Sequence, residues 1–291
     1  MDRQALTYAP PRDGVPSGGF GRLTFGFLAV SVLSGAALVP FYTPAAAWES
    51  LEKIQGGLAW GFFLRAVHAY ASFGVLVGMA AHLAQVVAAR TERQLPPAVW
   101  WRSTLLLPVT VAALLGGFVL RGDAEAVAAL SIWRRILESL PLAGTEIARL
   151  LLGSSSGDLG AVSLHHAGTL TLLLWLFTSE HAGRLLPDAR GTVLAALVSF
   201  ALAGVIPLSL GAPPAAVPAH LLGPWSLLGL QGALLILPSA AGWLLPFAFV
   251  LLLVLVRHVE GRVRRAVLAA LVASCVAYVF FTVRVLLSSR V

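Results

Sequence analysis

Charge is scarce in this sequence. Aspartate, glutamate, lysine and arginine make up 11% of the 291 residues, whereas hydrophobic residues make up 58% and the mean hydropathy is +0.86. A soluble domain of this size contains about a quarter charged residues, so the composition excludes an ordinary soluble fold. Apolar stretches long enough to cross a hydrocarbon layer of about 30 Å recur along the whole chain. We therefore predict an all-α, polytopic membrane protein.

Cysteine is nearly absent as well, since Cys275 is the only one and lies within an apolar stretch. A single cysteine excludes a disulfide framework and any site that needs several cysteine ligands. Lysine is equally rare: apart from Lys53 all basic residues are arginine, which suggests a GC-rich bacterial genome. The net charge of +7 is better explained by arginines on the cytoplasmic face of a membrane than by nucleic-acid binding.

Seven apolar segments are long enough to be membrane spans. They cover approximately residues 23–40, 58–88, 104–120, 161–186, 192–210, 231–257 and 266–288. Between the third and fourth, residues 123–160 mix apolar and charged residues, which predicts amphipathic helices on the membrane surface. Four prolines in 211–224 exclude a regular helix and predict an ordered interfacial loop or a fold-back between helices. The expected domains are a cytoplasmic N-terminal segment (1–22), a four-helix bundle domain (23–190) and a three-helix C-terminal membrane domain (191–291).

The arginines indicate an orientation. With a cytoplasmic N-terminus most of them fall on the cytoplasmic side, as basic residues do in membrane proteins. Residues 1–22 are polar and lack the short apolar core of a cleavable signal. We expect a multi-pass protein of the bacterial cytoplasmic (inner) membrane, with its N-terminus in the cytoplasm and its C-terminus outside.

Histidines on two of the predicted spans are the main functional signal. His68 and His82 lie 14 residues apart on the second span, and His166 and His181 lie 15 apart on the fourth. An interval of 14 brings two side chains within about 40° of one helix face and about 21 Å apart along the axis. Matched pairs on two helices can supply both axial ligands to each of two planar haems. Hydrogen-bonded core histidines are the alternative, but they leave the matched intervals unexplained.

His165 is an alternative to His166. On a straight helix it lies 16 residues from His181, about 160° around the axis, so helix geometry favours His166. A bulge in the fourth span would reverse that choice.

Small residues repeat the same interval. Gly21 and Gly35 lie 14 apart on the first span, and Gly117 on the third lies 14 after Ser103. Glycine lets a helix backbone approach a flat cofactor, although small residues are common at any helix contact in a membrane. Arg65 shares a helix face with the first histidine of the second span and could pair with a haem propionate. Its alternative role is a snorkelling arginine at the membrane interface.

With these residues in place, the chain resembles the cytochrome b family of the cytochrome bc complexes over nearly its full length. Residues 61–68, Gly-Phe-Phe-Leu-Arg-Ala-Val-His, are similar to the family pattern Gly-Trp-x-x-Arg-x-x-His, and His82 follows at the family interval. Residues 41–44 (Phe-Tyr-Thr-Pro) and 163–165 (Ser-Leu-His) are similar to the chloroplast-type branch. The Ser-Leu-His match favours its histidine as the ligand, whereas helix geometry still favours His166. The seven spans resemble that branch's haem subunit fused to its three-helix partner subunit.

The resemblance implies two haem b groups, a quinone as substrate or bound ligand, and no covalent haem, because the N-terminal segment lacks the necessary cysteine. The implied iron ligands are His68 with His166 or His165 near the outer face, and His82 with His181 near the cytoplasmic face. Arg184 and Asp188 are candidates for an inner quinone site. The implied partners are membrane lipid, an outer-face c-type cytochrome or Rieske-type iron–sulfur subunit, and a second copy of the chain; nucleic acid is not expected.

The outer quinol site departs from the family. Where the family has Pro-Glu-Trp-Tyr after the fifth span, this chain retains Trp225 but has Pro224 in place of the glutamate and Ser226 in place of the tyrosine. Quinol oxidation requires a group that accepts a proton, and proline has none. His220 is a possible substitute base, since the pKa of histidine suits the task. We expect the site to be inactive or rebuilt, with the outer haem exchanging electrons by direct contact with a partner protein.

Together these inferences favour a di-haem cytochrome b-type subunit of a membrane quinol oxidoreductase. As the electron-transfer subunit of a quinol:cytochrome c reductase-like complex, it would move electrons across the membrane between the quinone pool and an outer-face redox partner. The alternative is a haem-free membrane transporter or structural anchor. A transporter usually has inverted repeats and broken helices near the midplane, and neither is evident in the sequence.

Overall fold

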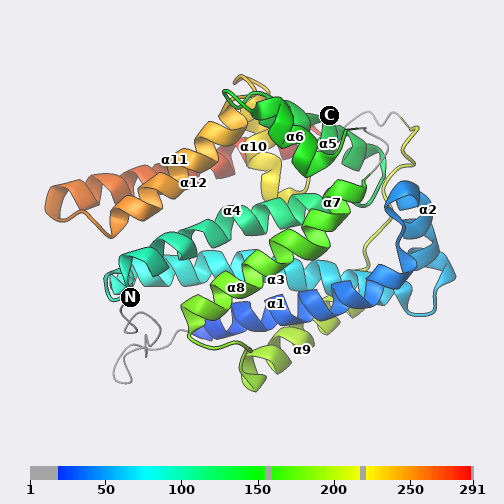
Figure 1. The fold of residues 1–291 in the computed structure, drawn as a ribbon, viewed down its shortest axis with the longest axis horizontal. Helices are drawn as coiled ribbons and strands as arrows, with labels where there is room; N and C mark the ends of the chain where they lie inside the picture. Colours follow the sequence, from blue (N-terminus) through cyan, green and yellow to red (C-terminus); the bar gives the residue numbers. More distant parts are fainter. Residues whose placement is uncertain (1–18, 155–158, 217–220, 290–291) are drawn as a thin grey trace.

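Helices are the only regular elements in the computed structural model, which describes residues 19–154, 159–216 and 221–289 (Figure 1). The longer helices are α1 (Gly19–Leu38), α3 (Gly61–Ala89), α4 (Pro97–Val119), α5 (Ala124–Glu138), α6 (Gly144–Leu152), α8 (Thr171–Ala182), α9 (Ala189–Val205), α11 (Ala241–Val256) and α12 (Gly261–Ser288). The shorter ones are η2 (Val39–Phe41), η3 (Pro44–Ala46), α2 (Ala47–Glu52), η4 (Lys53–Gly57), η5 (Thr91–Arg93), α7 (Gly160–Leu164), η6 (His165–Leu170), η7 (Trp225–Leu227) and α10 (Leu228–Leu234). Most of the predicted N-terminal segment, 1–22, lies outside the described residues.

The membrane-spanning pattern agrees with the prediction. Five helical stretches in the described residues are long and apolar enough to cross a membrane: Gly19–Phe41, Gly61–Ala89, Pro97–Val119, Gly160–Ala182 and Gly261–Ser288. Two shorter apolar helices, α9 and α11, have 17 and 16 residues. These seven elements correspond to the seven predicted spans, so the expected all-α, multi-pass membrane fold is confirmed.

Prolines change two of the predicted spans. The helix expected over 192–210 ends at Val205, because Pro207 disfavours helical geometry in the residue before it. The span expected over 231–257 is divided into α10 and α11 by a short turn that contains Pro238, a residue without a backbone N–H to continue a helix. The helix of the fifth span therefore ends five residues before the predicted limit, and the sixth span consists of two helices.

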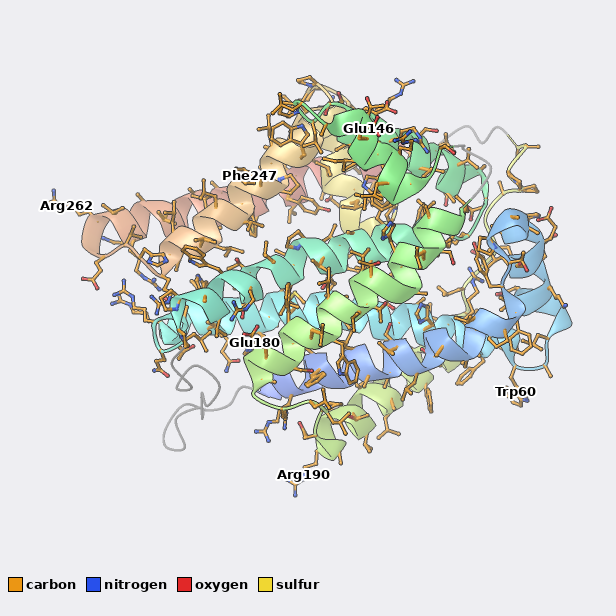
Figure 2. All side chains as sticks on the ribbon, viewed as in Figure 1. Trp60, Glu146, Glu180, Arg190, Phe247 and Arg262 are labelled. Carbon is orange, nitrogen blue, oxygen red and sulfur yellow. The ribbon has the colours of Figure 1, made fainter. Side chains whose placement is uncertain are left out.

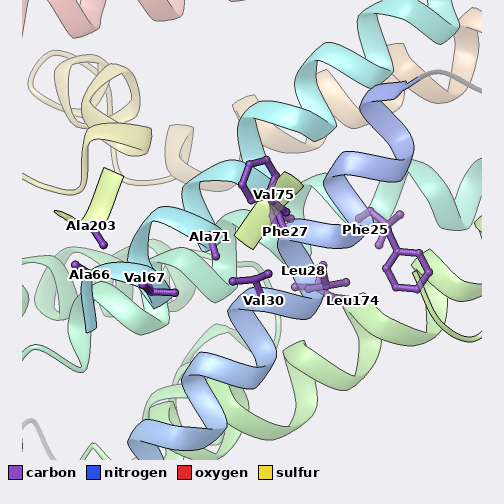
Figure 3. Packing of buried hydrophobic residues seen from close by; sticks show 12 residues of the cluster. Phe25, Phe27, Leu28, Val30, Ala66, Val67, Ala71, Val75, Leu174 and Ala203 are labelled. Atoms are coloured by element: carbon purple, nitrogen blue, oxygen red, sulfur yellow. The ribbon is translucent and has the colours of Figure 1, made fainter. Parts of the chain in front are cut away.

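The bundle consists of α1, α3, α4 and the stretch from α7 to α8, which run along the long axis of the molecule (Figure 1). The helix α1 packs along α3, α4 packs against α8, and α9 packs against both α1 and α3. Buried apolar side chains such as Leu28, Val67 and Ala71 fill the contact between α1 and α3 (Figure 3). Phe25 meets Trp175 of α8 edge-on, with ring centroids 5.4 Å apart. This packing fixes the relative positions of the two histidine-bearing spans.

A second group of helices follows the bundle in the chain. The helix α12 packs along α10 and α11, and α11 contacts α4 and α5. In Figure 1, α11 and α12 extend together away from the bundle, coloured orange to red. The amphipathic helices predicted between the third and fourth spans are present as α5 and α6, which pack against each other.

The proline-rich segment after α9 is non-helical over 207–216, as predicted. The Nε2 atom of Gln55 donates a hydrogen bond to the carbonyl oxygen of Leu208 at 2.9 Å, and Nη2 of Arg65 donates to that of Ser209 at 3.1 Å. Contacts from η4 and α3 therefore fix the start of the chain segment that leads to the second group of helices.

Candidate functional site

Two pairs of histidines face each other between α3 and the fourth span. His68 faces His166 of η6 with ring centroids 6.0 Å apart, and we call these the first pair. His82 faces His181 of α8 at 5.9 Å, and we call these the second pair. Two imidazole nitrogens bound to one metal ion from opposite sides, each at roughly 2 Å, place the ring centroids about 6 Å apart. Both separations therefore fit bis-histidine ligation of a metal.

Hydrogen bonds orient the rings of the first pair. Nδ1 of His68 lies 2.9 Å from the carbonyl oxygen of Ser31, and Nδ1 of His166 lies 2.9 Å from that of Ala113. A carbonyl oxygen only accepts, so Nδ1 must carry the ring proton in both histidines. Nε2 is then unprotonated and able to bind a metal, with the outer partner fixing the tautomer.

The predicted glycines lie against these rings. A Cβ atom on Gly35 would lie 2.8 Å from Cε1 of His68, and one on Gly117 would lie 2.9 Å from Cε1 of His166. Gly21 stands in the same relation to the second pair, where a Cβ would lie 3.1 Å from a ring carbon of His82. A side chain at any of these positions would displace a histidine, so the small residues spaced by 14 keep room at both levels.

The second pair borders a cavity of about 230 Å³. Nδ1 of His181 lies 2.9 Å from Oγ of Ser103, so the serine that the sequence spacing marks does contact this pair. Arg22 and Arg184 also line the cavity, and guanidinium groups suit the carboxylates of a propionate-bearing cofactor. The donor set, the arginines and the small residues together fit a haem.

Arg184 and Asp188, the candidates for an inner quinone site, lie close together. Nη2 of Arg184 is 3.3 Å from Oδ2 of Asp188, whose Oδ1 accepts from the backbone N–H of Gly191 at 2.8 Å. The hydrogen bond from Gly191 and the nearby guanidinium lower the pKa of Asp188. Asp188 thus caps α9, whereas Arg184 reaches the cavity of the second pair; quinone binding by either stays a prediction.

His165 points away from the first pair. Its Nδ1 lies 3.2 Å from Oγ1 of Thr169, and its Nε2 lies 3.1 Å from the carbonyl oxygen of Leu150 on α6. The helix does contain an irregularity here, because η6 is a π-helical turn. A π-helical turn takes up one additional residue. The 15 residues from His166 to His181 therefore make as many helical turns as the 14 residues between the two histidines of α3.

We expect His166→Ala to abolish haem binding at the first pair and His165→Ala to leave it intact. The two variants are matched controls for each other, since they remove the same side chain from adjacent positions. The measurement is a redox titration of the haem spectrum of each purified variant. If the haem signal of the first pair is lost in His165→Ala but not in His166→Ala, the π-helical turn is rotated in the haem-loaded protein.

Arg65 has other partners than the one suggested by sequence. Its Nη2 donates to the carbonyl oxygen of Ser209, as described above. Its Nη1 donates to the side-chain oxygen of Gln55 at 2.5 Å and lies 3.5 Å from the carbonyl oxygen of Leu208. These contacts hold the loop after α9 against the bundle. A contact between Arg65 and a haem propionate stays a prediction.

The altered quinol motif lies in the short helix η7 and at its N-cap, directly before α10. The ring of Trp225 meets that of Phe73 edge-on with centroids 5.5 Å apart, and the hydroxyl of Tyr278 donates to the carbonyl oxygen of Ser226. His220 lies outside the described residues. Pro224 lines a cavity together with Glu125, a residue that sequence reasoning missed. Its only signal was a carboxylate in the first turn of an amphipathic helix.

A multi-pass helical protein with two facing histidine pairs inside its bundle falls in the class of membrane haem proteins. The family model for cytochrome b/b6/petB matches residues 16–181, which is more than half of the chain and includes all four paired histidines. The chain therefore belongs to the cytochrome b family. Membership implies haem b as the cofactor and an interaction with quinone.

The similar proteins include a reductase subunit and a cytochrome b6. Over 136 residues the chain is 32% identical to the menaquinol:cytochrome c reductase cytochrome b subunit of Bacillus subtilis, covering 46% of this chain and 61% of that protein. Over 158 residues it is 24% identical to cytochrome b6 of Desmonostoc sp., covering 54% of this chain and 74% of that protein. The match thus spans about three fifths of the Bacillus protein.

A solved structure extends the likeness of fold. A chain of a hyperthermophilic respiratory complex III superposes with a TM-score of 0.68 over 91% of this chain and 83% of that one, at 18% sequence identity. At this identity the match shows a shared fold, and it includes the second group of helices that the family model does not reach.

Proposed function

We propose that the chain is the di-haem cytochrome b-type subunit of a membrane quinol oxidoreductase complex. It moves electrons across the membrane between the quinone pool and an outer-face partner, a c-type cytochrome or a Rieske-type iron–sulfur protein. The observation that carries the proposal is the presence of two facing histidine pairs, at 6.0 and 5.9 Å, spaced by 14 residues on α3. That interval separates the two levels by about 21 Å along the helix.

The side chains of this protein bind and insulate the two cofactors. A bound haem supplies one-electron chemistry at its iron, with a potential tuned by its ligands and their hydrogen bonds. The carbonyl oxygens of Ser31 and Ala113 hold the histidine rings of the first pair, and Ser103 holds His181. The apolar core between α1 and α3 excludes water from the space between the two levels. That packing would keep water, and with it protons, out of the space between two bound haems.

The arrangement of arginines supports a cytoplasmic location for the second pair. Arg90 and Arg93 follow the end of α3 that carries this pair, and Arg93 pairs with Glu260 at the start of α12. Figure 2 shows Arg262 at this end of the molecule and Trp60 at the other. Basic residues favour the cytoplasmic side, and tryptophan favours either membrane interface. We therefore propose an N-terminus inside and a C-terminus outside, in a bacterial inner membrane, with the first pair near the outer face.

The test is a quinol-driven reduction of the complex isolated from its native membrane. We expect two b-type haems per chain that titrate as separate one-electron components. We further expect a short-chain naphthoquinol or duroquinol to reduce haem that dithionite also reduces. A preparation without haem would leave the transporter or anchor alternative as the better explanation. Haem that dithionite reduces but neither quinol reduces would rule out exchange with the quinone pool.

A further inference from the structure

A cavity lies between α5, the segment 221–224 and α10, next to the altered quinol motif. Its lining is apolar over most of its surface, with leucines from α10 and the 221–224 segment on one side and Trp133 of α5 on the other. Glu125 is the only ionisable residue that lines it in the described part of the chain. The cavity is small, about 80 Å³, so leucine side chains must turn aside to admit a ring.

The polar groups around this cavity have different tasks. Gln231 accepts from the backbone N–H of Gly223 at 2.8 Å and donates to the carbonyl oxygen of Leu221 at 2.9 Å. Both ends of its amide are therefore engaged in holding the cavity wall. Gln231 shapes the cavity, and it leaves Glu125 as the group able to exchange a proton with a ligand.

The neighbouring acid, Asp123, is committed to structure. It is fully buried, accepts from the backbone N–H of Ala126 at 2.9 Å as the cap of α5, and pairs with Arg121. The same guanidinium lies 3.1 Å from Oε2 of Glu125, whose side chain is 27% exposed. Arg121 thus holds the Glu125 carboxylate in place while that carboxylate keeps access to the cavity.

The cavity also lies beside the first histidine pair. Leu115 of α4 lines it, and the next residues along the chain, Gly116 and Gly117, lie against His166: a Cβ on each would be 3.4 and 2.9 Å from the nearest atom of that histidine. Leu115 and Gly117 lie about 200° apart around the helix axis, so α4 itself separates a ligand in the cavity from the first pair.

We propose that Glu125 accepts a proton from quinol in this cavity and replaces the glutamate that is missing at Pro224. The inference rests on the proposed function. Of the two expectations for the outer quinol site, inactive or rebuilt, it favours a rebuilt site. Oxidation of one quinol to quinone releases two electrons and two protons. The Glu125 carboxylate takes one proton and becomes the carboxylic acid, and water at the outer surface takes the other. The two electrons pass to one-electron oxidants, which are iron centres of the complex.

The experiment compares Glu125→Gln with Glu125→Asp and with Glu138→Gln in the complex in native membranes. Glu138 is exposed at the other end of the same helix, so it is a matched control. A general base contributes about 10²–10⁴-fold, and we expect Glu125→Gln to lower kcat for short-chain naphthoquinol by at least roughly 100-fold. The KM should change little, and the dithionite-reduced haem spectrum should not change. Glu125→Asp should retain partial activity with a shifted pH profile, and Glu138→Gln should behave as the wild type.

A second readout does not depend on turnover. Redox infrared difference spectra with the same quinol should contain a carboxylic-acid C=O band that disappears in Glu125→Gln. A wild-type complex that quinol cannot reduce would overturn the proposed function itself. An active wild type with an equally active Glu125→Gln variant would overturn only the role of Glu125, and loss of activity in His220→Ala would then identify the base. If the Glu125→Gln variant loses its haem, the Glu125→Asp variant decides the question. An unchanged kcat and an unchanged pH profile in Glu125→Asp would then overturn the assignment of Glu125 as the proton acceptor.

Discussion

Replacing His68 with alanine should remove one haem from each chain, and replacing His82 or His181 should remove the other. In the proposed arrangement two imidazoles would hold each haem, so alanine at one of these positions would leave its iron with one protein ligand in place of two. The haem content should fall from two to one per chain, and one of the two components of the redox titration should disappear. The His82 and His181 variants should lose the same component because they belong to one pair.

His258→Ala is the matched control. This histidine is exposed and accepts a hydrogen bond from the indole N–H of Trp101 at 3.3 Å, outside both pairs. It should keep both haems. A wild-type protein with one haem per chain, or a haem spectrum that none of the three variants alters, would contradict the assignment of the pairs.

The histidine pairs could be predicted because they depend on local regularities. Helix geometry converts an interval of 14 residues into one face of one helix, and an apolar composition predicts where the helices run. The same rule identified Gly35 and Gly117, which lie against His68 and His166. The amphipathic character of residues 123–160 likewise predicted α5 and α6 without any knowledge of their neighbours.

Features that depend on distant contacts could not be predicted in the same way. Two partners of Arg65, Leu208 and Ser209, lie in a loop more than 140 residues further along the chain, and no local pattern specifies them. The π-helical turn at His165 changes the helical phase by about one residue, which periodicity alone does not reveal. In the sequence Glu125 is one of several charges on an amphipathic helix. Its position beside a cavity depends on the packing of α10, which the sequence of α5 does not specify.

A buried ion pair joins the C-terminal helices to the bundle. Glu92, in the turn between α3 and α4, is fully buried, and Arg264 of α12 is 4% exposed. Nη1 of Arg264 lies 2.7 Å from Oε1 of Glu92 and donates to the carbonyl oxygen of Val256 at 2.8 Å, while Nη2 donates to that of Val87 at 3.0 Å. One guanidinium thus connects the ends of α3 and α11 with the start of α12.

Glu92→Ala should therefore destabilise the protein by about 3–5 kcal/mol, because it leaves the Arg264 guanidinium buried without a countercharge. Arg265→Ala is the matched control: it removes an exposed arginine one residue further on and should change stability by no more than about 0.5 kcal/mol. Combining Glu92→Leu with Arg264→Met should recover most of the loss, since both charges and both desolvation penalties disappear together. The measurement is denaturant unfolding in detergent followed by tryptophan fluorescence. If Glu92→Ala is no less stable than Arg265→Ala, the ion pair does not fasten the C-terminal helices, and their attachment depends on the apolar contacts between α11 and α4.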